Sequence, residues 1–158
     1  MKLTLGQVRG ALQLSQDAYR HWKTVLAPLA GRNGHKPSFS HGDLFALAII
    51  KALTDDVGVP VGNLNSAALA LFASCDNQPW AKFERLVALV QPKSGALSFV
   101  SDGQPLQEAQ VMISIPCGPI ISALRSALMM DQPQEPQGSF RFPLSAVADR
   151  RNVEGEKS

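Results

Sequence analysis

The first half of the chain carries apolar residues at helical spacing, in short segments that turn residues separate. In residues 4–12, Leu5, Val8 and Leu12 fall three and four positions apart, and Thr4 precedes them as a suitable N-cap. This pattern predicts a short helix. Gly10 lies inside the segment and weakens its helical propensity.

A second helix is expected from Ser15 onward, because its apolar and polar residues fall on different faces. The face expected to pack inward includes Tyr19 and Trp22, and the outer face is basic. Two short helices across a tight turn, with the second offering charge on its outer side, are typical of a helix-turn-helix that enters a DNA groove. The polar residues assigned away from the inner face are Gln16, Arg20, His21, Lys23 and Thr24.

Turn residues divide the chain after this helix. Residues 27–28, Ala-Pro, end it, and residues 31–37 are so rich in turn residues that they predict a loop with positive charge at its tip. Ser40 precedes a strongly apolar helix over about residues 43–55. Residues 61–64 then lead into a further helix that continues to about residue 73.

The second half of the chain mixes helical and strand patterns. A short amphipathic helix is predicted over residues 80–90, and a hairpin follows with strands at 96–100 and 109–115 around a turn at 102–105. A last helix is predicted over residues 120–130. Because two strands alone are rarely stable, the hairpin is expected to pack on helices or to pair with another subunit.

Positive charge is concentrated near the N-terminus. Residues 1–36 hold six Lys and Arg side chains against one acid, Asp17, whereas the remaining residues hold nine basic and twelve acidic side chains. A local basic segment on an otherwise slightly acidic protein suits attraction to phosphate, but it equally describes an ordinary solvated face. Charge alone therefore leaves both interpretations open.

Four stretches, in order and at similar spacing, resemble the DNA-binding domain of the MerR family of transcriptional regulators. They extend over about residues 3–70, less than half of the chain. They are Leu5–Val8, similar to the family's opening I-G-E-L-A; Ser15–Trp22, similar to its recognition-helix pattern; Gly34–Lys36 with Phe39 and Asp43-Leu44, similar to its wing and next helix start with one insertion; and Val57–Leu64, similar to its L-G-F-S-L-E-E-I segment.

The resemblance implies a winged helix-turn-helix. It assigns Arg20 to a recognition-helix contact and His21 to the adjoining contact, and it matches Tyr19 and Trp22 to buried positions. It makes Arg32, His35 and Lys36 wing residues near phosphate or the minor groove. The candidate DNA-binding residues are therefore Gln16, Asp17, Arg20, His21, Lys23, Arg32, His35 and Lys36.

Several of these residues have an ordinary structural alternative. Asp17 stands where the family usually has a basic residue, and an acid that faces DNA either repels phosphate or accepts a hydrogen bond from a cytosine amino group. The alternative for Arg20 is a surface contact with Gln16 or Asp17. His35 and His41 are expected as solvated loop residues rather than ligands.

The chain departs from the family beyond residue 75. Family members continue into a long coiled-coil helix that forms the dimer, but here residues 76–79 interrupt the chain and no sustained heptad follows. We therefore expect the apolar segments of the second half, including Met129 and Met130, to form core or a homodimer interface in preference to an effector site.

These patterns predict a mainly α protein with small β elements. Residues 1–75 are predicted as the winged helix-turn-helix, residues 76–145 as a small α+β dimerisation or effector unit, and residues 146–158 as a mobile tail that follows a polar linker at 131–138. The expected function is that of a transcriptional regulator that binds double-stranded DNA as a homodimer. The alternatives are a DNA-architectural, recombination-accessory or phage-packaging protein, or a protein-interaction module that has lost DNA binding.

Other functional classes have little support in the sequence. All three histidines precede residue 42, and no paired-carboxylate, phosphate-loop or nucleophile-elbow pattern is present, so no enzyme activity, cofactor or metal is expected. Cys75 and Cys117 have no partner at ligand spacing and are expected as buried free thiols. No run approaches the roughly 18 apolar residues of a membrane span, and the N-terminus lacks a signal-peptide layout, which predicts a cytoplasmic protein.

Overall fold

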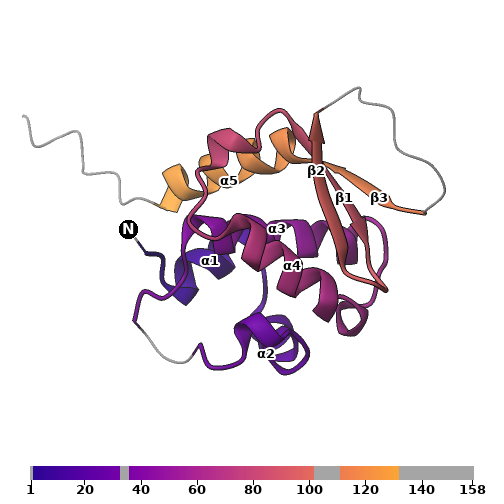
Figure 1. The fold of residues 1–158 in the computed structure, drawn as a ribbon. Helices are drawn as coiled ribbons and strands as arrows, with labels where there is room; N and C mark the ends of the chain where they lie inside the picture. The colour runs from indigo at the N-terminus through magenta and orange to yellow at the C-terminus, as the bar shows by residue number, and fades with distance from the viewer. Residues whose placement is uncertain (1, 33–35, 102–110, 132–158) are drawn as a thin grey trace, which may run out of the picture.

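The computed structural model describes residues 2–32, 36–101 and 111–131 and shows a mainly helical chain with one small antiparallel sheet, so the predicted fold class is confirmed at this level (Figure 1). The predicted linker at 131–138 lies outside the described residues except for Asp131, and the predicted tail lies wholly outside them. The described elements are α1 (Leu5–Leu12), α2 (Gln16–Val25), α3 (His41–Asp55), α4 (Asn65–Cys75), β1 (Leu86–Gln91), β2 (Ala96–Ser101), β3 (Ile113–Pro116) and α5 (Cys117–Asp131).

Local capping fixes where the first three helices begin. The Thr4 hydroxyl accepts a bond from the Gln7 amide at 3.2 Å, and the Gln7 side chain accepts one from the Thr4 amide at 2.9 Å, which completes a capping box. Ser15 caps α2, and Ser40 forms a second capping box with Asp43 at the start of α3. The predicted helix starts at Thr4 and Ser15 are confirmed, and α3 begins directly after Ser40.

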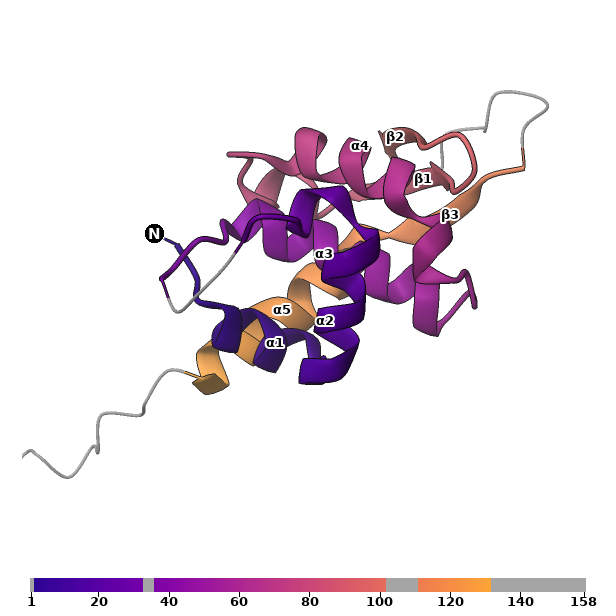
Figure 2. The ribbon, with the colours of Figure 1, turned by 90° about the horizontal axis from the view of Figure 1, so that it is seen from below.

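The helix α3 lies at the centre of the molecule. Ten of its fifteen residues are buried, and α1, α4 and α5 all contact it (Figures 1 and 2). Tyr19 and Trp22 of α2 are 4% and 5% exposed, so their predicted core positions are confirmed. Buried apolar residues from Leu3 to Leu124 form one cluster, which includes side chains from both halves of the chain.

The sheet has the strand order β2-β1-β3, with both pairings antiparallel. Ala88 of β1 lies opposite Phe99 of β2 and Ile115 of β3, and these three residues belong to or pack against the core. The next residue, Leu89, lies opposite Ser98 and therefore on the other face. The helix α4 packs against β2 and joins the sheet to the helical part.

The prediction of a helix over residues 80–90 is wrong. Trp80–Lys82 forms a short 3₁₀ helix, and Leu86–Gln91 forms β1, the central strand. The sequence Leu-Val-Ala-Leu-Val is a short apolar run, for which helical and strand periods cannot be separated. Ala88, Leu89 and Val90 are all buried, so the strand lacks the apolar-polar alternation that would have marked it.

The predicted pairing of residues 96–100 with residues 109–115 in a hairpin is wrong as well. The strand β2 pairs with β1 and not with β3, and the tight turn lies at residues 92–95, where Gly95 has a φ of 72°. Glycine adopts this left-handed conformation without strain. The predicted turn at 102–105 lies outside the described residues.

The winged helix-turn-helix is not confirmed. Among the described residues between α2 and α3, Ala27–Leu29 form a 3₁₀ helix and Phe39 forms a single antiparallel bridge with Leu3, which precedes α1. These residues form no two-stranded wing. Residues 33–35 of the predicted wing lie outside the described residues. The bridge joins the segment before α1 to the segment before α3, and it therefore holds the N-terminal ends of these two helices close together.

The contact between α3 and α4 generates a stability prediction. An ideal Cβ at Gly42 would lie 2.0 Å from the carbonyl oxygen of Cys75, so Gly42→Ala must push backbone apart. We expect it to lower the free energy of unfolding by about 2 kcal/mol or more. Gly62→Ala is the matched control, because nothing lies within 4 Å of its Cβ position. Urea denaturation measures both, and equal midpoints for the two variants would contradict the packing of α3 on α4.

Candidate nucleic-acid interface

The helix α2 is held by one face and exposes the other. Its inner residues Tyr19 and Trp22 are buried, and it packs on the 3₁₀ helices Ala27–Leu29 and Val61–Asn63. Figure 2, seen from below, shows α2 at the near side of the molecule. Gln16, Asp17, Arg20 and His21 are exposed, and Lys23 is half-buried. The predicted division of this helix into an inner and an outer face is therefore confirmed.

The outer face of α2 carries an exposed ion pair. The Arg20 Nη1 lies 3.8 Å from the Asp17 Oδ1, and the two side chains are 69% and 95% exposed. Solvent screens such a pair, which contributes about 1 kcal/mol at most. The alternative predicted for Arg20, a surface pair with Asp17, is thus present, but it leaves the guanidinium accessible.

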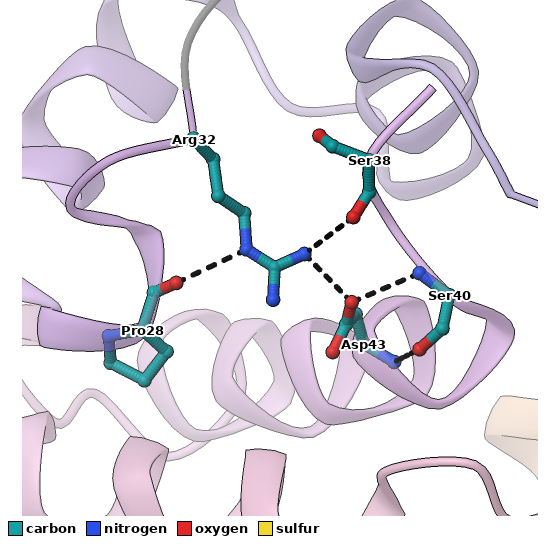
Figure 3. Close-up of polar contacts among 5 residues, drawn as sticks. All are labelled: Pro28, Arg32, Ser38, Ser40 and Asp43. Atoms are coloured by element: carbon teal, nitrogen blue, oxygen red, sulfur yellow. Dashed lines mark hydrogen bonds and ion pairs between the residues drawn. The ribbon is translucent and has the colours of Figure 1, made fainter. Parts of the chain in front are cut away.

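The remaining candidate residues follow α2 in the chain. Lys36 is exposed, and His35 lies outside the described residues. Arg32 has a different setting: its side chain is 24% exposed and turns toward the start of α3 (Figure 3). This setting differs from the solvent-facing wing position that the family resemblance implies.

Arg32 binds three acceptors with two of its nitrogens (Figure 3). Its Nε donates to the Pro28 carbonyl oxygen at 3.2 Å, and its Nη1 donates to the Ser38 carbonyl oxygen at 3.0 Å and to the Asp43 Oδ2 at 2.7 Å. The same carboxylate oxygen accepts a bond from the Ser40 amide at 2.9 Å. Charge-assisted bonds of this kind are about twice as strong as neutral ones.

Aromatic rings complete the surroundings of the guanidinium. The Arg32 Cζ lies 4.9 Å from the centre of the Phe39 ring and 5.5 Å from that of Phe72. The Asp43 side chain is 9% exposed, so the pair is shielded from water on the carboxylate side. Sequence reasoning missed this cluster, although the Ser40-x-x-Asp43 capping pattern could have drawn attention to Asp43.

Tyr19, on the inner face of α2, interacts electrostatically with Arg32. Its hydroxyl is buried and has no hydrogen-bond partner among the described residues. Burial raises the pKa of Tyr19, and the nearby positive charge of Arg32 lowers that pKa to a smaller extent. The inner face of α2 therefore lies within electrostatic reach of the Arg32 guanidinium.

His41 is not the solvated loop residue that was expected. It is the first residue of α3 and is half-buried, and its ring packs edge-on against Trp80 at 5.4 Å between centres. The Trp80 indole nitrogen donates to the His41 carbonyl oxygen at 2.8 Å. These contacts fix the connection that leads from α4 to β1 against the start of α3.

Both cysteines are buried free thiols, as predicted. Burial raises the pKa of Cys75 to about 12 and that of Cys117 to about 11. Within the described ranges, no group of three or more His, Cys, Asp or Glu side chains could hold a metal ion. None of the described helices is both long and apolar enough to cross a membrane.

Comparison with known proteins returns no relative. No protein-family description matches the chain, and neither a curated protein nor a solved structure is significantly similar to it.

The raised thiol pKa values generate a prediction for reactivity and pH dependence. Because burial shields both thiols and raises their pKa values, iodoacetamide should leave both cysteines unmodified in the folded protein at pH 8 and alkylate them in guanidinium chloride. Because the folded-state pKa values exceed the ordinary value of 9.0, the free energy of unfolding should be unaffected by these thiols below pH 9 and fall as pH rises toward 12. Mass spectrometry reads the first effect. Rapid native alkylation would contradict the burial of the two thiols.

Proposed function

We propose that this protein is a sequence-specific DNA-binding transcriptional regulator that acts as a homodimer. The observation that carries the proposal is the outer face of α2, where a short helix anchored by Tyr19 and Trp22 presents Gln16, Arg20 and His21 to solvent. A helix fixed by one face and polar on the other is the arrangement by which a recognition helix enters the major groove. The resemblance of residues 3–70 to the MerR DNA-binding domain supports the same assignment.

The first turns of α2 supply the side chains that read bases. Gln16 and Arg20 are four residues apart and therefore lie on one side of the helix. Glutamine pairs in bidentate fashion with adenine, and arginine with guanine, in the major groove. Asp17, which is adjacent to Gln16, accepts a hydrogen bond from a cytosine amino group.

Positive charge around this helix supplies the contacts to phosphate. Lys23 follows the base-reading residues along α2, and Lys36 is exposed on the segment that comes after the helix. His21 supplies the polar contact that adjoins Arg20. Phosphate contacts position the protein without reading sequence. Arg32 is left out of this set, because Asp43 already offsets its charge. His35 stays a predicted wing contact.

One observation favours a second candidate, a protein-interaction module without DNA binding. Asp17 is 95% exposed and lies beside Arg20, so part of the positive charge on the outer face is offset. The two candidates differ in a direct measurement, because only the first retains DNA across a salt series. A DNA-architectural, recombination-accessory or packaging role uses the same surface, and mapping of genomic binding sites separates it from promoter regulation.

Arg20→Ala tests the assignment of α2. We expect it to weaken binding to a selected DNA site by about 1–3 kcal/mol, roughly tenfold to a hundredfold, and to relax the base preference at one position. Arg85→Ala is the matched control, since Arg85 is an exposed arginine that directly precedes β1 and is not part of α2. Fluorescence anisotropy over a salt series measures both variants.

Two results of this experiment would contradict the proposal. Equal losses of affinity in the Arg20 and Arg85 variants would show that α2 is not the contact surface. Failure of the wild-type chain to bind any duplex DNA at low salt would favour the protein-interaction module instead.

The exposed end of α5 generates a prediction for the homodimer. Met129 and Met130 are 76% and 88% exposed, and a homodimer would place two α2 helices on successive major-groove faces about 34 Å apart. We expect the double substitution Met129→Lys and Met130→Lys to convert a dimer to a monomer in light scattering and to weaken DNA binding. Val57→Lys, at another exposed apolar residue, serves as the control. A wild-type chain that is monomeric at micromolar concentration would contradict the homodimer.

A further inference from the structure

We propose that Arg32 is a positioning residue of the DNA interface: it clamps the segment between α2 and α3 onto the start of α3 and thereby holds Lys36 in place relative to α2. This inference rests on the proposed function.

Arg32 binds both ends of the segment between α2 and α3. Pro28 lies just beyond the end of α2, and Ser38 lies just before the start of α3. One guanidinium binds the carbonyl oxygens of both residues and also the Asp43 carboxylate (Figure 3). The two ends of the segment that carries Lys36 are therefore fixed to each other and to α3.

The same guanidinium is linked to the start of α1. It lies over the Phe39 ring at 4.9 Å, and Phe39 forms the antiparallel bridge with Leu3. The Leu3 amide donates to the Phe39 carbonyl oxygen at 2.6 Å, and the Ser38 and Phe39 amides both donate to the Leu3 carbonyl oxygen at 3.1 Å. Loss of the clamp should therefore loosen this bridge, which is a measurable consequence that does not involve DNA.

Arginine is required for this geometry. Its planar fork presents Nε and Nη1 in fixed directions, so it can reach Pro28 on one side and Asp43 on the other. A lysine keeps the positive charge but concentrates it in one ammonium group, and it has no nitrogen at the Nε position. Arg32→Lys therefore separates the charge of the residue from its clamping function.

The electrostatic setting argues against a direct phosphate contact by Arg32. Two of its three nitrogens are already bonded, and its side chain is 24% exposed. The buried Asp43 carboxylate at 2.7 Å offsets its charge. A phosphate contact and a clamp therefore predict opposite responses when Asp43 loses its charge.

Asp43→Asn and Arg32→Lys test the proposal together. If Arg32 contacted phosphate, Asp43→Asn would free its charge and raise DNA affinity, and Arg32→Lys would keep most of the affinity. If Arg32 clamps, each variant lowers the affinity about tenfold. The asparagine introduced by Asp43→Asn keeps a side-chain oxygen for the Ser40 amide, so the helix cap survives. Fluorescence anisotropy over a salt series gives affinities and slopes, and circular dichroism confirms that each variant is folded.

A double-mutant cycle with Lys36→Ala tests whether Arg32 acts through that residue. In the wild type, Lys36→Ala should reduce the salt slope by about one. In the Arg32→Lys background, where Lys36 is already misplaced, the same substitution should have a much smaller effect. Arg20→Ala is the control, and its effect should be equal in both backgrounds. Full additivity of Arg32→Lys and Lys36→Ala would overturn the proposal.

Amide hydrogen exchange supplies the readout without DNA. Arg32→Lys should increase exchange at the Ser38 and Phe39 amides at least tenfold, while amides in the middle of α3 keep their protection. Unchanged exchange at these two amides would overturn the clamp even if DNA binding were altered. A wild-type chain that binds no DNA would overturn the proposed function, and with it the role of Arg32 in DNA binding, whereas the exchange result would still report on the clamp itself.

Discussion

The burial of α3 requires a partner for the one charged side chain in its buried surface. Asp43 lies in the first turn of this helix, and its side chain is 9% exposed. A carboxylate in such a place costs several kcal/mol unless it is paired and hydrogen-bonded. Arg32 and the Ser40 amide satisfy that need. One residue earlier, Gly42 leaves room for the Cys75 carbonyl oxygen at the end of α4.

The need to pair Asp43 also shapes the surface proposed to bind DNA. After α2 the chain passes through the 3₁₀ helix Ala27–Leu29 and brings Arg32 to Asp43 at the start of α3. Tyr19 and Trp22 on the inner face of α2 are buried, while Gln16, Asp17, Arg20 and His21 are exposed. Recognition is most precise when side chains are mounted on a rigid element, and the burial of Tyr19 and Trp22 anchors α2 in this way.

Features with a local cause could be predicted from the sequence, and features with a distant cause could not. Thr4, Ser15 and Ser40 mark helix starts because each caps amides only three residues away. The strand β1 has no such local mark, since pairing on both of its edges makes it central, and its buried residues follow one another without alternation. Gly95 lies in the turn between β1 and β2, but the helix predicted over residues 80–90 left residues 109–115 as the only predicted partner for the strand at 96–100.

The same distinction applies within the candidate interface. The outer face of α2 follows from helical periodicity alone, whereas the orientation of Arg32 depends on Asp43 and on Phe72 of a different helix. A count of charges therefore overstates the positive field near the N-terminus, because Asp43 offsets Arg32 and Asp17 partly offsets Arg20. With fewer unpaired cations, counterion release contributes less to DNA affinity. On the proposed function, hydrogen bonds from Gln16 and Arg20 to base edges must then supply a larger share of the binding free energy.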